Sequence, residues 1–114
     1  MWQMIALISF AFPQMPIPEL KTDLNEQDVR VHALLREVIN HGADLYNRGD
    51  ANGCYRLYEG ALLALRAHAQ MHPDWQAEIS CAFERAAGKP QVAQRAFVLR
   101  EAMDRIRCET DPVR

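Results

Sequence analysis

The sequence has no excess of basic residues, which argues against nucleic acid as a partner. Its 114 residues include 13 Lys and Arg against 15 Asp and Glu, so the formal net charge is −2. Proteins that bind nucleic acid usually concentrate positive charge on one surface. Apolar residues make up 49% of the chain and charged residues 25%, as in ordinary globular proteins. The length is that of one domain with a single core.

The chain also lacks closely paired cysteines. Cys54, Cys81 and Cys108 are widely spaced and form no CxxC motif, so neither a zinc ribbon nor a dithiol redox site is expected. We expect Cys54 and Cys81 to be small apolar residues of the core, because free cysteine is among the most buried residue types. Cys108, near the C-terminus, should be exposed.

No apolar run is long enough to cross a membrane. The longest, residues 1–12, has no charged residue, but a spanning helix needs about 20 residues. Its length suits the apolar part of a signal peptide, although the basic start is missing. Two interpretations stay open: a signal remnant of an exported (periplasmic or secreted) protein, or an arm of a cytoplasmic protein that packs on its own domain or on a second copy.

Three prolines follow this run, Pro13, Pro16 and Pro18, and they favour an extended path as far as residue 20. The sequence therefore predicts three parts. Residues 1–21 form an apolar segment and a proline-rich arm, residues 22–108 form a helical domain, and residues 109–114 form a frayed tail.

The helical domain should begin with two helices joined by a tight turn. Asp23 and Glu26 have the spacing of a capping box, so the first helix is expected to begin at Asp23. It should end near Gly49, which can adopt a left-handed conformation, and Asp50 is a natural N-cap for a second helix that ends near Gln70. The apolar residues recur at helical spacing. They are Val31, Leu34, Leu35, Val38, Ile39, Gly42, Leu45 and Tyr46 in the first helix, and Cys54, Tyr58, Ala61, Leu62, Leu65 and Ala69 in the second.

Two more helices follow, each opened by a proline. Pro73 and Pro90 are expected at first helical positions, where a missing N–H does no harm, and Gly88 should end the third helix. Their apolar faces are Trp75, Ile79, Ala82, Phe83 and Ala86, then Val92, Ala96, Leu99, Met103 and Ile106. On the opposite face of the fourth helix, Arg100 with Asp104 and Glu101 with Arg105 are expected as supporting ion pairs. No stretch shows the alternation of a half-buried strand. The predicted fold is all-α, either a four-helix up-down bundle or two stacked helical hairpins, with an extended N-terminal arm.

The corner between the first two helices resembles a tetratricopeptide repeat, the helix-turn-helix unit of protein interaction arrays. The residues that carry the resemblance are Gly42, Gly49, Cys54, Tyr58 and Ala61. The resemblance covers about residues 35–68 and departs from the family at Val38 and Arg66, where Trp and Pro are frequent. Residues 69–102 do not repeat the pattern. The resemblance implies one helical hairpin, closed off by a second, unrelated hairpin.

Two groups of polar residues have spacings that occur in metal or catalytic sites. His68 and His72 stand four residues apart, a spacing found in metal sites, but two surface histidines at a helix end explain the same pattern. Glu37, His41 and Asp44 share one helical face and would suit a general base, but a solvated face explains them equally. No catalytic motif and no cofactor motif is present, so an enzyme is not favoured.

The residues without a structural role at the corner are Tyr46, Arg48, Tyr55 and Arg56. Exposed aromatic rings beside arginines are typical anchors of protein interfaces. We therefore expect a small non-catalytic module that binds a protein partner at these four residues or self-associates, for example as a homodimer through residues 1–20. The alternative is a helical bundle that binds a small ligand or a metal, with His68 and His72 as ligands.

Overall fold

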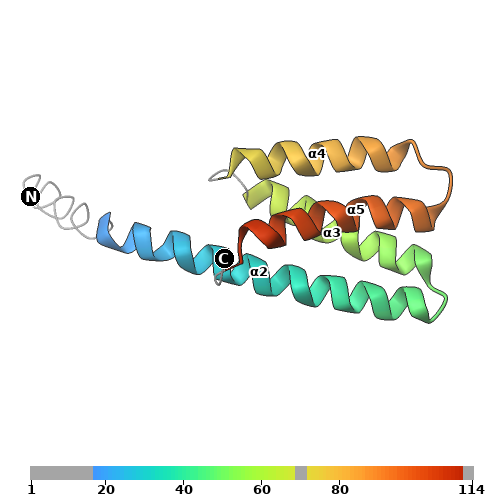
Figure 1. Ribbon diagram of the computed structural model, residues 1–114, viewed down its shortest axis with the longest axis horizontal. Coiled ribbons are helices and arrows are strands. Elements are labelled where there is room, and N and C mark those ends of the chain that lie inside the picture. The colour runs from blue at the N-terminus through green and yellow to red at the C-terminus, as the bar shows by residue number, and fades with distance from the viewer. Residues whose placement is uncertain (1–16, 69–71, 112–114) are drawn as a thin grey trace, which may run out of the picture.

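The computed structural model describes residues 17–68 and 72–111, with side chains from Glu26 onward. The described chain contains four helices: α2 (Ile17–Asn47), α3 (Ala51–His68), α4 (Pro73–Ala87) and α5 (Val92–Glu109). Consecutive helices run in opposite directions, which gives an up-down-up-down bundle without strands in these residues (Figure 1). The predicted all-α fold is confirmed.

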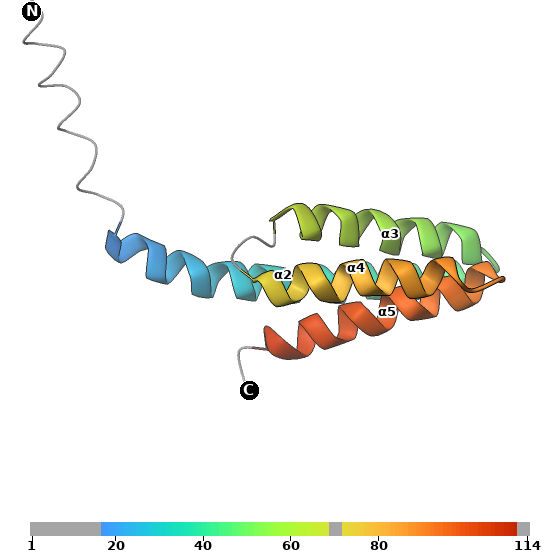
Figure 2. The same cartoon turned by 90° about the horizontal axis from the view of Figure 1, so that it is seen from above.

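The four helices form a diamond in cross-section, with α3 and α5 in contact across its short diagonal. In Figure 1, α2 and α4 lie on opposite sides with α3 and α5 between them, whereas in Figure 2, α3 and α5 lie on opposite sides of α2 and α4. Helices α3 and α5 each pack against all three other helices, whereas α2 and α4 do not contact each other. The two hairpins are therefore held together by α5, which contacts both α2 and α3, and by α3, which also contacts α4.

Helix α2 begins earlier than the sequence indicated, at Ile17 instead of Asp23. Pro18 does not prevent this, because a proline in the first helical turn removes no hydrogen bond that the helix would otherwise make. Residues 17–20 are thus helical, and the expectation of an extended arm was wrong for them. Residues 1–16 lie outside the described part of the chain. Helix α2 is longer than its neighbours and projects beyond the bundle (Figures 1 and 2).

The other helix ends follow the predicted signals closely. Pro73 is the first residue of α4, as expected, and Gly88 follows its last residue. Helix α5 begins at Val92, two residues after Pro90, because the N-cap Gln91 still has an extended backbone. Predicted helix starts at prolines are therefore accurate to within two residues here.

The buried core collects the predicted apolar faces of all four helices. Its largest fully buried side chains are Tyr58, Leu35, Leu62, Ile79, Leu99, Met103 and Ile106. Leu34 and Tyr46 were expected on the buried face of the first helix but are exposed. Cys54 is buried and Cys108 exposed, as expected, whereas Cys81 is exposed and was wrongly placed in the core. Cys81 follows the fully buried Ile79 by two helical positions, about 200° around α4, and so faces outward.

The C-terminal end of α5 is packed into the bundle. Glu109 is the last residue of α5 and accepts a hydrogen bond from the indole Nε1 of Trp75 at 2.8 Å. Thr110 is buried, and its hydroxyl donates to the carbonyl oxygen of Ile106 at 3.1 Å. The helical domain therefore extends beyond residue 108, its predicted end, and includes Glu109 and Thr110, which were expected to belong to a frayed tail. Residues 112–114 lie outside the described part.

Candidate functional site

The corner between α2 and α3 is made by a left-handed glycine and a capping aspartate. Gly49 has a φ of 89°, which residues with a Cβ rarely adopt. The backbone N–H of Asp50 then donates to the carbonyl oxygen of Leu45 at 2.9 Å. The carboxylate of Asp50 accepts a hydrogen bond from the N–H of Gly53 at 2.8 Å, as an N-cap does. Both predicted roles, helix stop at Gly49 and helix cap at Asp50, are confirmed.

Close contact between α2 and α3 depends on Gly42. A Cβ added at this glycine would clash with the ring of Tyr58, which is 2% exposed. The Tyr58 hydroxyl donates to the carbonyl oxygen of Ile39 at 3.2 Å and so ties α3 to α2. The same buried ring also lines a pocket beside the corner.

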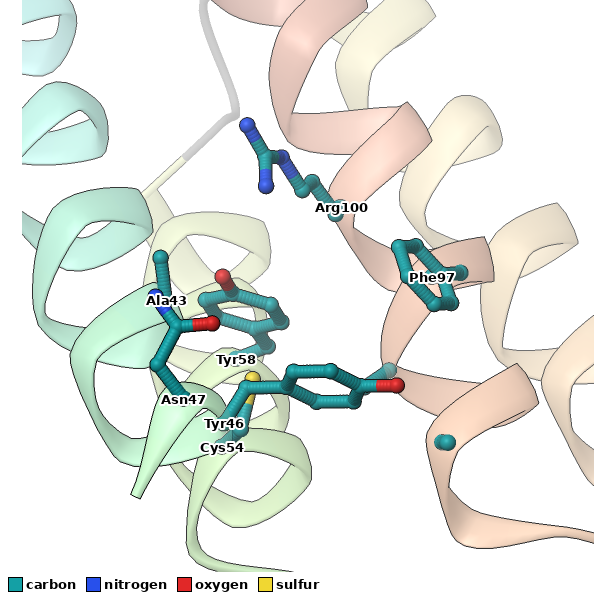
Figure 3. Close-up of a pocket in the computed structure, with 9 residues that line it drawn as sticks. Ala43, Tyr46, Asn47, Cys54, Tyr58, Phe97 and Arg100 are labelled. Carbon is teal, nitrogen blue, oxygen red and sulfur yellow. The ribbon is translucent and has the colours of Figure 1, made fainter. Parts of the chain in front are cut away.

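A pocket of about 290 Å³ opens beside the corner (Figure 3). Buried Cys54 and Tyr58 of α3 lie at its base. Its walls include Ala43 of α2 and two alanines of α5, Ala93 and Ala96. These short side chains leave space between the C-terminal end of α2 and the N-terminal half of α5.

Two aromatic rings line the pocket from opposite helices. Tyr46 of α2 and Phe97 of α5 meet edge to face, with ring centroids 5.8 Å apart. Tyr46 is 40% exposed and Phe97 is 55% exposed, so much of both rings faces solvent. Exposed rings of this size beside a cavity are available to a partner.

The polar groups among the lining side chains belong to Tyr46, Asn47, Arg100 and the two residues at the base, Cys54 and Tyr58. Burial raises the pKa of the Cys54 thiol above its ordinary value, although Tyr58 and the positive charge of Arg100 act in the opposite direction. Burial also raises the pKa of the Tyr58 hydroxyl. Both groups therefore stay neutral near pH 7, and Arg100 is the one charged residue among those that line the pocket.

The four residues predicted from the sequence as a binding surface do not all lie together at this pocket. Tyr46 lines the pocket; Arg48, Tyr55 and Arg56 do not. The Tyr55 hydroxyl donates to one carboxylate oxygen of Glu59 at 3.2 Å, and Arg56 Nη1 donates to the other at 2.9 Å. The Arg56 guanidinium carbon also lies 5.5 Å from the centre of the Tyr55 ring. Tyr55 and Arg56 are thus engaged within α3, while Arg48 is an exposed residue of the turn.

The two histidines proposed as metal ligands have different surroundings. His68 is exposed at the end of α3. The ring of His72 stacks on Trp75 with centroids 3.9 Å apart, and its Nε2 lies 3.2 Å from Asp28 Oδ1. A hollow of about 460 Å³ borders both histidines. Within residues 17–68 and 72–111, no three His, Cys, Asp or Glu side chains are grouped closely enough to hold a metal ion.

The residues considered for general-base chemistry lie on the outer face of α2. Glu37, His41 and Asp44 are all exposed, as the solvated-face interpretation expected. They lie in neither of the two hollows described above. Their arrangement provides no enclosed place for a substrate.

Sequence reasoning missed most of the pocket, because its α5 wall has no local signature. Phe97 and Ala93 are off the predicted apolar face of α5, and Arg100 was assigned to a surface ion pair with Asp104. That pair is present, with 3.8 Å between Arg100 Nε and Asp104 Oδ2. The aromatic Phe97 off the predicted core face was the one available signal, and it was a weak one, because single exposed apolar residues are common on protein surfaces.

The described chain belongs to the class of all-α, up-and-down four-helix bundles. None of its described helices combines the length and the apolar character that crossing a membrane would require. Comparison with known proteins gives no match to a family model, to a curated protein or to a solved structure.

Proposed function

We propose that this protein is a small non-catalytic interaction module that binds a protein partner at the pocket between α2, α3 and α5. The observation that carries the proposal is the exposed ring pair of Tyr46 and Phe97 beside an apolar cavity. Aromatic residues around a concave apolar surface are frequent anchors of protein interfaces. The resemblance of residues 35–68 to a tetratricopeptide repeat supports the same function.

The burial and the raised pKa of Cys54 at the base of the pocket also favour a binding function over a catalytic one. Cys54 is 3% exposed, and burial raises its pKa, so little thiolate forms near pH 7. A buried thiol with a raised pKa is a poor nucleophile. The pocket therefore provides a concave, apolar surface that a protein partner can bind.

Photo-crosslinking in the native host cells tests the proposal. The photoreactive residue p-benzoylphenylalanine replaces Phe97 in one variant and Leu63 in a control. Leu63 is a suitable control because it is 45% exposed and lies outside the pocket. We expect a discrete crosslinked protein at position 97 that is absent at position 63, and mass spectrometry of the product identifies the partner segment.

The affinity of the purified partner provides the quantitative measurement. Phe97→Ser and Tyr46→Ser should each weaken binding by about tenfold or more, as truncation of an interface anchor does. Leu63→Ser should change the affinity by less than about twofold. Equal crosslinking at positions 97 and 63, or unchanged affinity in both pocket variants, would overturn the proposal.

A second copy of the chain is also a candidate partner, because residues 1–20 contain an apolar run. Light scattering of the full chain, of Phe97→Ser and of a chain without residues 1–16 distinguishes a second copy of the chain from a different protein as the partner. A dimer that dissociates in both variants would identify the second copy as the partner and the N-terminal segment as part of the interface. A bundle that binds a small molecule at this pocket is a further candidate and is tested below, whereas the alternative with His68 and His72 as ligands concerns the other hollow.

A further inference from the structure

We infer that the pocket receives one apolar side chain from a partner helix, and that Arg100 binds a carboxylate carried by the same helix one turn away. This inference rests on the proposed function and adds the chemistry of the partner. It combines three properties of the pocket, which are its size, the helices that flank it and its charge.

The size of the pocket suits a single large side chain. Its volume of about 290 Å³ is just below the range of typical small-molecule sites, about 300–1,000 Å³. The side chains of Ala43, Ala93 and Ala96 are too short to fill the space between α2 and α5. An aromatic or branched aliphatic side chain would fill this space and contact the ring of Tyr58 at the base.

The flanking elements suit a helix as the segment that carries this side chain. Helices α2 and α5 run antiparallel on either side of the pocket, and α3 lies at its base (Figures 1 and 3). Two neighbouring helices form a groove into which the side chains of a third helix pack. The rings of Tyr46 and Phe97 meet across this gap and would contact such a helix with their exposed parts.

The charge of the pocket determines what else the partner helix carries. Arg100 is the one charged residue of the lining, and no carboxylate lines the pocket. Its side chain is 41% exposed, and it extends from α5 over the gap between the helices (Figure 3). The 3.8 Å between its Nε and Oδ2 of Asp104 is too long for a good hydrogen bond, so this exposed and weak ion pair can give way to a carboxylate of the partner.

The geometry of a helix places such a carboxylate close to the apolar anchor. Residues three or four positions apart lie on the same helical face, with Cβ atoms about 5–6 Å apart. A Glu or Asp at that spacing from the anchor would reach Arg100 while the anchor occupies the cavity. Arginine binds carboxylates in a bidentate manner, which also fixes the direction of the partner helix.

Model peptides and the full-length protein test the inference. The probe is a capped helical peptide of Ala and Gln with one Phe and with one Glu four residues away. Its matched forms replace Glu by Gln, Glu by Lys, or Phe by Ala. Binding is measured by NMR shifts of the backbone amides of Ala43, Ala96 and Arg100.

The protein variants separate the role of Arg100 from a general charge effect. Arg100→Gln removes the charge, Arg100→Lys retains it, and Arg85→Gln is the control. Arg85 is matched to Arg100 because its side chain is also 41% exposed and pairs with an acidic residue, Glu101. A dispersed NMR spectrum establishes that each variant is folded.

The expected result is a loss of affinity of about two- to fivefold for the Gln peptide or for Arg100→Gln, as for a partly exposed ion pair. The two changes together should cost little more than either alone, because they remove the same interaction. The Phe→Ala peptide should not shift the pocket amides. Arg85→Gln should bind all peptides as the unaltered protein does.

The contrary outcomes distinguish a failure of the carboxylate inference from a failure of the proposed function. If the Gln or Lys peptide binds in the pocket as tightly as the Glu peptide, the carboxylate inference is wrong and the proposed function stands. If no peptide shifts the pocket amides but phenylacetate does, the pocket is a small-molecule site and both proposals are wrong. If neither phenylacetate nor any peptide binds, both are also overturned.

Discussion

At the scale of single residues, the contact between Gly42 and Tyr58 controls how closely the first two helices pack. The Tyr58 ring occupies the space that a side chain at position 42 would need, and its hydroxyl is bonded to the backbone of Ile39. A larger residue would push α3 away from α2, and the pocket base would move with it. The same ring thus supports both the fold and the candidate site.

Gly42→Ala should lower the free energy of unfolding by about 1–3 kcal/mol, because overpacking displaces a buried ring. Gly60→Ala is the control, since nothing lies within 4 Å of a Cβ added at this exposed position of α3. That substitution should stabilise the protein by about 0.5–1 kcal/mol, because Gly is unfavourable within a helix. Urea denaturation measures both, and equal effects of the two substitutions would contradict the packing argument.

The raised pKa of Cys54 predicts how stability depends on pH. The unfolded thiol ionises near pH 8.5, whereas the folded thiol keeps its proton to a higher pH because it is buried. Stabilisation from this group is therefore complete below about pH 8.5 and is lost as the pH rises toward the folded pKa. The slope can reach about 1.4 kcal/mol per pH unit.

Urea denaturation under reducing conditions at several pH values above and below 8.5 tests this expectation. Cys54→Ala should remove the alkaline loss of stability that the thiol causes, whatever its effect at neutral pH. Cys81→Ala should leave the loss in place, because Cys81 is exposed. An unchanged slope in Cys54→Ala would show that the buried thiol is not its source.

At the scale of elements, the helices depend on tertiary contacts to different degrees. Among the side chains of α2 that the structure describes, from Glu26 onward, Asp28 meets His72 and Val31 packs against the core. The part of α2 before these residues projects beyond the bundle (Figures 1 and 2). A helical stretch of about ten residues without packing is marginal in water.

Backbone amides in residues 17–27 should therefore exchange with solvent at least about a hundredfold faster than those in residues 35–46. Both ranges belong to α2, so the comparison is within one helix. Hydrogen exchange followed by NMR or mass spectrometry measures the difference. Comparable protection in both ranges would indicate that the projecting part is covered, for example by a second copy of the chain.

At the scale of the whole molecule, the candidate site exists because three helices meet at one place. Its base comes from α3, and its walls come from the end of α2 and the beginning of α5, about fifty residues apart along the chain. Packing of α5 against both α2 and α3 brings these segments together. A change in how the two hairpins dock would therefore abolish the pocket even if every helix remained intact.

The sequence by itself determined the helices, their turns and most of the core. These features depend on local physics: the periodicity of apolar residues, the left-handed glycine Gly49, the cap Asp50 and the proline at the start of α4. Of the residues proposed as a binding surface, only Tyr46 proved to line the pocket. Tyr55 and Arg56 instead bind Glu59, a nearby residue of their own helix that the sequence reasoning had not paired with them.

Only the tertiary structure decided which helix faces meet, and the site depends on that choice. The sequence suggested a surface pair between Glu101 and Arg105 on one helix, but each binds a residue of α4, Arg85 or Glu78. Val98 and Ala102 are buried although they lie off the predicted stripe, because α5 is packed on several sides at once. Phe97 and Arg100 face α2 for the same reason. Helix periodicity fixes which residues share a face, whereas the neighbour of that face is set by packing between segments distant in the chain.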